Sequence, residues 1–82
     1  MEKLKRQEAL TRAAETGDLT GIDLSGVDLS ETNLVRVDFR ESNLEGANFR
    51  NSELTEAEFR DAKMNGADFS GAKMGRAVLI GA

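Results

Sequence analysis

Large apolar residues occupy every fifth position of this chain from Leu19 to Leu79, without a gap. A period of five matches neither the 3.6-residue period of an α-helix nor the two-residue period of a regular strand. The chain is therefore a repeat protein, and the repeat decides its fold. We name these thirteen residues the centres: Leu19, Leu24, Leu29, Leu34, Phe39, Leu44, Phe49, Leu54, Phe59, Met64, Phe69, Met74 and Leu79.

Each five-residue unit is predicted to be a very short strand followed by a corner. In the stretch Val27-Asp28-Leu29, the first and third side chains point the same way in an extended chain, and Asp28 points the opposite way. Thr32 comes three residues after Leu29, so its side chain stays inward only if the chain bends between units. Turn-forming pairs such as Ser25-Gly26 follow the centres. Repeated bends in one sense wind the chain into a solenoid.

The phenylalanines indicate how many sides each coil has. They stand ten residues apart and alternate with Leu or Met centres, which suits an even number of sides. With four sides, Phe39 stacks on Phe59 and Phe49 stacks on Phe69, on two opposing walls. Adjacent coils would then pair as parallel strands about 4.8 Å apart. The sequence predicts an all-β solenoid of about three four-sided coils.

Residues 2–16 are predicted to form a single helix, because strong helix formers fill this stretch and Gly17 stands where a C-terminal cap belongs. Two acid-to-base pairs at i, i+4 support it, Glu2 with Arg6 and Glu8 with Arg12. A helix of about 15 residues is marginal alone, so we expect it to pack on the open first turn of the repeat. The expected division is a capping helix over residues 1–17 and a β-helix over residues 18–82.

Composition excludes several classes of protein. The chain has no Cys and no His, which removes disulfides, thiolate ligands and imidazole. Its net charge of −4 argues against binding to nucleic acid or to an anionic membrane. No stretch approaches the roughly 18 apolar residues of a transmembrane helix, and the charged N-terminus lacks the core of a signal peptide. We expect a cytoplasmic protein, or a segment of a longer one.

Acidic side chains are the candidates for catalysis or metal binding, and their pattern disfavours both. They stand immediately before the centres and point outward, and a filled interior offers no cleft in which the pKa values of two carboxyls could be pushed apart. Flat ladders such as Asp38 with Glu58 do not cup a calcium ion, and Arg40 and Arg60 fit better as their cross-strand partners. We expect no enzyme, no cofactor and no catalytic or metal-binding residue.

Several units closely resemble the pentapeptide-repeat family, whose pattern is commonly written A(D/N)LXX. They include Ile22-Asp23-Leu24-Ser25-Gly26, Val27-Asp28-Leu29-Ser30-Glu31, Ala47-Asn48-Phe49-Arg50-Asn51 and Ala67-Asp68-Phe69-Ser70-Gly71. The resemblance covers residues 17–81 and implies a right-handed, four-sided β-helix with Leu or Phe pointing inward. The family is mostly bacterial.

Family function carries over less directly. The best-known members resemble duplex DNA and bind type II topoisomerases, but they are taller, strongly acidic and usually paired end to end. This chain has about three coils, mixed surface charge and an N-terminal helix. Other members are appendages of larger proteins, including components of secretion systems. We favour a non-catalytic scaffold or interaction module, with a topoisomerase-directed DNA mimic and a secretion-apparatus component as alternatives.

The last unit departs from the pattern. In Ala77-Val78-Leu79-Ile80-Gly81 both outward positions, Val78 and Ile80, are apolar, whereas every other unit carries a polar residue or glycine at one of them. An exposed β-edge invites pairing with another chain. We therefore expect Val78 and Ile80 to contact a protein partner or a second copy of the chain, although a frayed end would show the same sequence.

Overall fold

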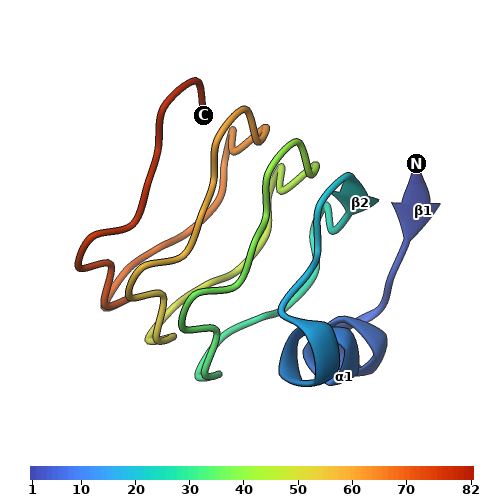
Figure 1. Ribbon diagram of the computed structural model, residues 1–82, viewed down its shortest axis with the longest axis horizontal. Coiled ribbons are helices and arrows are strands. Elements are labelled where there is room, and N and C mark those ends of the chain that lie inside the picture. The colour runs from blue at the N-terminus through green and yellow to red at the C-terminus, as the bar shows by residue number, and fades with distance from the viewer.

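A computed structural model describes all residues, 1–82, and shows the chain wound into a β-helix with one helix at its N-terminal end (Figure 1). The elements in chain order are strand β1 (Glu2–Lys3), helix α1 (Arg6–Thr16) and strand β2 (Ile22–Asp23). The two strands pair in parallel, with Glu2 opposite Ile22. The remaining coils are held by single bridges, because each wall is too short to form a longer strand.

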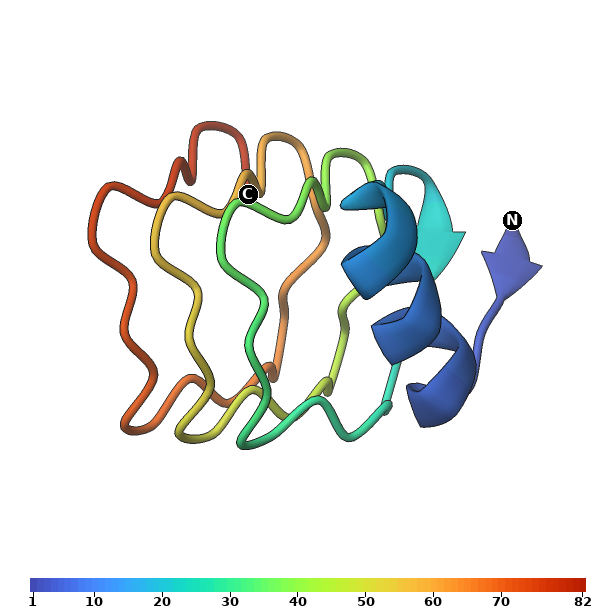
Figure 2. The same cartoon turned by 60° about the horizontal axis from the view of Figure 1, so that its bottom comes forward.

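The coils repeat every twenty residues, as four units per turn require (Figure 2). The amide of Leu19 donates to the carbonyl of Asp38 at 2.8 Å, and the amide of Phe39 donates to the carbonyl of Glu58 at 2.7 Å. Every bridge is parallel and joins the residues before two centres: Asp18–Asp38, Asp23–Asn43, Asp28–Asn48, Asn33–Glu53, Asp38–Glu58, Asn43–Lys63, Asn48–Asp68, Glu53–Lys73 and Glu58–Val78.

A β-turn forms the corner after each strand. The amide of Val27 donates to the carbonyl of Leu24 at 3.1 Å, and the third residue of that turn, Gly26, has a φ of 69°. Positive φ at this position is the mark of a type II turn. The same position has positive φ in every unit from Gly21 to Gly81, including seven residues that are not glycine: Glu31, Arg36, Glu41, Asn51, Glu56, Asp61 and Arg76.

In nine of the thirteen units the residue before the centre fixes its corner through a local hydrogen bond, and the four units without it carry Glu53, Lys63, Lys73 and Val78 at this position. The Asp23 carboxylate accepts from the amide of Ser25 at 3.0 Å and from its hydroxyl at 2.7 Å. Asn33 accepts from the amide of Val35 at 3.1 Å in the same way. Asp and Asn side chains have the right length for this Asx turn, which explains their recurrence at this position of the unit.

The interior is one continuous apolar cluster of seventeen residues running from the cap into the third coil. Phe39 stacks on Phe59 with ring centroids 5.0 Å apart, and Phe49 stacks on Phe69 at 4.9 Å, which confirms the predicted pairs. The two stacks meet edge to face across the interior, 5.6 Å apart at Phe39 and Phe49. Edge-to-face contact is favourable between aromatic rings, so the stacks also tie opposing walls together.

The N-terminal prediction is wrong for residues 2–5, which are extended rather than helical. Leu4 stands twenty residues before Leu24, on the same five-residue count as the centres, and only 3% of its surface is exposed. Its amide donates to the carbonyl of Asp23 at 3.2 Å. Burial of Leu4 and pairing of β1 thus outweigh the local helix propensity. Strand β1 lies beside β2 and adds one wall of a further coil before the first complete coil.

Helix α1 then crosses the open end of the coil (Figure 2). It begins after Lys5, whose amide donates to the Glu8 carboxylate at 2.8 Å. It ends at Gly17, which has a φ of 70° and donates its amide to Ala13, as predicted for a C-terminal cap. Ala9 is fully buried, so α1 closes the interior where the first coil would otherwise expose Leu19 and Leu24.

Replacing Phe49 by Ala should lower the free energy of unfolding by about 3–5 kcal/mol, because the ring is fully buried between two coils. Phe69 lies in the last coil and is only partly buried, so Phe69→Ala should cost clearly less. Urea unfolding followed by circular dichroism measures both. Equal losses for the two variants would contradict the packing described here.

The corner aspartates should make stability depend on acid pH. The amide and hydroxyl of Ser25 hold the pKa of Asp23 below its ordinary value of 3.8, and the hydroxyl and amide of Ser30 and Ser70 do the same for Asp28 and Asp68. A pKa lowered on folding stabilises the folded state above the ordinary value, and this stabilisation is lost as pH falls through the folded-state pKa.

We therefore expect a constant urea midpoint down to about pH 5 and a decline below about pH 3.8. Urea titrations across this range measure it. In a Ser25→Ala, Ser30→Ala, Ser70→Ala variant the decline should be smaller, because the hydroxyl donors are gone and the backbone donors remain. A decline of unchanged size in that variant would contradict the assignment.

Candidate interaction surfaces

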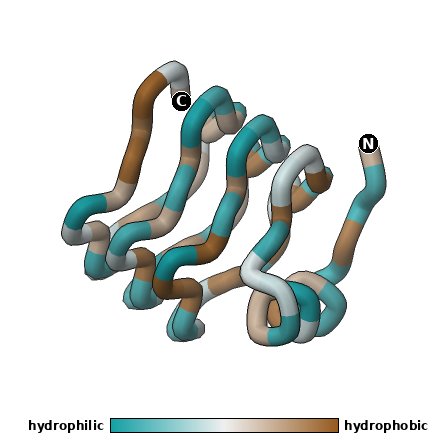
Figure 3. The backbone as a smooth tube through the Cα atoms, in the orientation of Figure 1, coloured by the Kyte–Doolittle hydropathy of each residue, from teal (hydrophilic) through white to brown (hydrophobic).

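The last unit of the repeat carries three apolar residues in a row, Val78, Leu79 and Ile80, and Figure 3 shows this part of the backbone as a continuous brown stretch before the C-terminus. Ile80 is 68% exposed and Leu79 is 48% exposed, whereas Val78 is partly covered. The backbone of this unit is held to the coil below it, since the carbonyl of Val78 accepts from Phe59 at 2.8 Å and that of Ile80 accepts from Asp61 at 3.1 Å.

Leu79 was not among the residues predicted to contact a partner. As a centre, it was expected to point inward, and it does follow the same five-residue spacing as the buried leucines. Its exposure arises because no further coil covers the last interior layer, which leaves Phe69 and Met74 partly exposed as well. The sequence signal was its position as the final centre of the series.

The last coil also presents an unpaired backbone edge. In the coils before it, the amide of each centre donates to the coil that follows, as Leu44 does to Lys63 at 2.7 Å. The corresponding amides of the last coil donate to no protein group: Met64, Phe69, Met74 and Leu79. We name this row of amides the C-terminal edge. It alternates with free carbonyls at Ala67, Ala72 and Ala77, and so has the pattern of a strand edge that can accept another strand.

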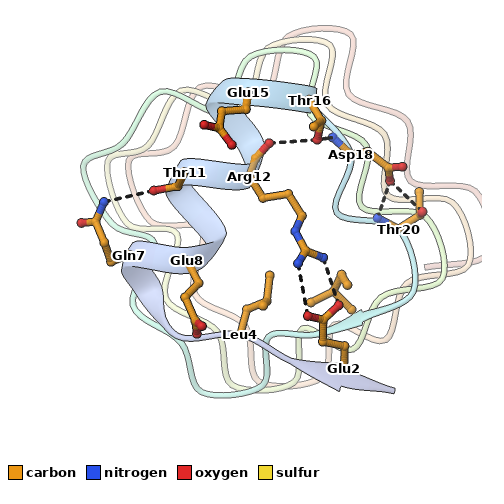
Figure 4. A pocket seen from close by; sticks show the side chains of 11 residues that line it. Glu2, Leu4, Gln7, Glu8, Thr11, Arg12, Glu15, Thr16, Asp18 and Thr20 are labelled. Carbon is orange, nitrogen blue, oxygen red and sulfur yellow. Dashed lines mark hydrogen bonds and ion pairs between the residues drawn. The ribbon is translucent and has the colours of Figure 1, made fainter.

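An open pocket of about 670 Å³ lies at the other end of the molecule, between α1, β1 and the first coil (Figure 4). The expectation of no cleft is therefore wrong at this point. Its lining is mostly polar, with Leu4 and Ile22 the apolar contributors. The side chain of Arg12 crosses the pocket to the Glu2 carboxylate, with contacts of 3.1 and 3.2 Å. This pair replaces the predicted partners of both residues.

Two carboxylates of this pocket, those of Glu2 and Asp18, have lowered pKa values. The hydrogen bond and charge of Arg12 lower the pKa of Glu2, and in return Glu2 raises the pKa of Arg12. The amide and hydroxyl of Thr20 lower the pKa of Asp18. A general acid at neutral pH needs a raised carboxyl pKa, and these shifts go the other way. Glu2 and Asp18 are therefore poor general acids at neutral pH.

Ion pairs neutralise much of the outer surface. Asp38 lies 2.7 Å from Arg40 of its own unit, and this hydrogen-bonded contact lowers the pKa of Asp38. The prediction of cross-strand pairing is wrong for both Arg40 and Arg60, because the turn brings the two side chains of one unit together, and Arg60 lies 3.5 Å from Glu58 of its own unit. Cross-coil pairs form elsewhere: Arg36–Glu56, Arg50–Asp68, Lys73–Glu53 and Arg76–Glu56. No unbroken row of negative charge results.

No cluster of three or more acidic side chains is arranged to hold a metal ion. The single helix is also too short and too polar to cross a lipid bilayer.

The solved structures that this chain matches include pentapeptide repeat proteins. A 1.7 Å crystal structure of a pentapeptide repeat protein from the thylakoid lumen of Arabidopsis thaliana is 43% identical, with a TM-score of 0.61, over 74% of this chain. This chain spans 39% of the length of that protein. A pentapeptide repeat protein from Nostoc is 23% identical with a TM-score of 0.40, over 98% of this chain and 74% of its own. Comparison with curated proteins gives no match.

The family model for pentapeptide repeats matches the sequence in eight copies, over residues 18–55, 32–71 and 42–81. These ranges cover the whole series of centres, and they agree with the twenty-residue ladder and the Asx corners seen in the structure. The match leaves only the segment that forms β1 and α1 outside the repeat. The chain belongs to the pentapeptide-repeat family.

Proposed function

We propose that this chain is a non-catalytic interaction module. In this proposal a right-handed, four-sided β-helix of about three coils serves as a rigid scaffold and presents its last coil to a second copy of the chain. The observation that carries the proposal is the C-terminal edge, where free amides and carbonyls border the exposed side chains of Leu79 and Ile80. Rigidity is supported by the interior of the first two coils, where every centre is buried.

A second copy suits this end because the edge is complementary to itself. Two copies related by a two-fold axis would meet through the same surface. Such an axis, perpendicular to the solenoid, reverses the strand direction, so the two edges would pair antiparallel, the arrangement that alternating donors and acceptors allow. Residues 63–82 carry Lys63, Lys73 and Arg76 against Asp68, a net charge of +2. Added salt should therefore strengthen this association by screening like charges.

The double substitution Val78→Asp and Ile80→Asp should convert the dimer to a monomer, because it places charges in a desolvated contact. Light scattering coupled to size exclusion measures the mass across a range of protein concentrations. The matched control is Asn33→Asp with Val35→Asp, which adds charges at the same two places of an early unit. Retained dimer in the first variant, or dissociation in the control, would contradict the proposal. A wild-type monomer that instead captures another protein through Val78 and Ile80 would identify a different partner at the same end.

The ion-paired surface does not favour a DNA mimic. We expect no inhibition of supercoiling by a bacterial type II topoisomerase, and no protection of that enzyme from quinolones, at micromolar concentrations of this protein. A gyrase supercoiling assay measures both. Inhibition that grows with concentration would support the DNA-mimic alternative instead.

A further inference from the structure

The two ends of the solenoid differ in whether side chains satisfy the backbone groups that have no neighbouring coil. In the body, carbonyls of each coil accept from amides of the coil before it. The first coil has no complete coil before it. On two of its walls the outward carbonyls belong to Asp23, Ser25, Asp28 and Ser30, and we name these four the N-terminal edge. The equivalent carbonyls on the other two walls, those of Asp18, Thr20, Asn33 and Val35, accept no hydrogen bond from the protein. One coil further on, the equivalent carbonyls of Asn43, Glu45, Asn48 and Arg50 accept from the amides of Leu24, Gly26, Leu29 and Glu31.

Two cationic side chains donate to these carbonyls in place of the amides that a preceding coil would supply. The ammonium group of Lys3 donates to the carbonyl of Ser25 at 2.6 Å. The guanidinium group of Arg6 donates to the carbonyl of Asp28 at 2.7 Å and to that of Ser30 at 3.3 Å. Only the carbonyl of Asp23 is taken by a backbone donor, the amide of Leu4. Side chains thus replace three of the four missing backbone amides.

Such a cap satisfies the carbonyls but cannot extend the ladder. Ammonium and guanidinium groups donate hydrogen bonds and accept none, so an arriving strand finds no acceptors where the next ladder step would be. Lysine and other charged residues are the usual means by which proteins protect exposed sheet edges. Both side chains also stand beside carboxylates, Lys3 at 3.8 Å from Asp23 and Arg6 at 3.4 Å from Asp28.

The two ends of this chain would otherwise attract each other. Inside the solenoid, carbonyls of this kind accept hydrogen bonds from the amides of the centres. The C-terminal edge carries four such amides without acceptors, so it could donate to the N-terminal edge of another copy. The charges are also complementary, since residues 18–37 carry Asp18, Asp23, Asp28 and Glu31 against Arg36, a net −3, and residues 63–82 carry a net +2. A head-to-tail contact of this kind does not close, and it generates fibres.

We propose that Lys3 and Arg6 act as edge guards, which means that their charged groups occupy the N-terminal edge and leave the C-terminal edge as the place where another strand can add. They block the addition of a strand on the two walls that carry the N-terminal edge, and so favour association through the C-terminal edge. This inference does not depend on which partner the C-terminal edge binds.

The test is the double variant Lys3→Ala with Arg6→Ala, compared with the control Arg36→Ala with Arg50→Ala, which removes the same charge from the body of the solenoid. Light scattering over increasing protein concentration is the measurement, with circular dichroism to verify folding. We expect the average mass of the edge variant to exceed that of the wild type about twofold or more at high concentration, and the control to match the wild type. Equal masses for all three folded proteins would overturn the proposal.

A second variant keeps the test decisive if Lys3→Ala with Arg6→Ala does not fold. Lys3→Met with Arg6→Met keeps unbranched aliphatic side chains at both positions and removes only the charged donors. If this variant folds, its mass decides the question by the same criterion. If both variants unfold while the control stays folded, the two side chains stabilise the cap alone, and the edge-guard proposal is overturned.

Discussion

A hydrogen-bond ladder with a step of twenty residues holds this molecule together, and the other features depend on it. The ladder requires the chain to turn after every fifth residue, and seven of these corners place a non-glycine residue at positive φ. Such a backbone costs about 1–2 kcal/mol per residue. The ladder offsets this cost locally, since the amide of Glu31, itself such a residue, donates to Arg50 at 2.9 Å in the next coil.

Sequence periodicity predicted those parts of the fold that repeat. The Phe39–Phe59 and Phe49–Phe69 stacks follow from ten-residue spacing and a four-sided coil, because each position is defined by its register alone. Gly17 was identified as the end of the helix from local cap chemistry. Residues 2–5 were assigned to the helix because local propensity favours it, whereas the partner of Leu4 lies twenty residues away.

The candidate surfaces were predictable to a smaller degree. Val78 and Ile80 stand out in sequence because they break the polarity of the unit, but Leu79 was missed because a centre is normally covered. The pairing of Arg12 with Glu2 could not be read from helical spacing, since it requires β1 to leave the helix. The polar pocket beside it exists for the same reason, and so do the contacts that Lys3 and Arg6 make with the first coil.

The register of twenty also sets which changes of length this architecture tolerates. An insertion of five residues preserves the inward and outward pattern of every unit, yet it moves all later centres to the next wall. Placed between Phe49 and Leu54, it would bring Leu54 opposite Phe39 and Met64 opposite Phe49, and both aromatic stacks would be lost. An insertion of twenty residues adds one complete coil and keeps every centre on its own wall, and a phenylalanine at the matching centre of the added coil would continue the stack. Such a solenoid can therefore lengthen in whole coils at little cost, and its height above the cap is the quantity that evolution can vary most freely.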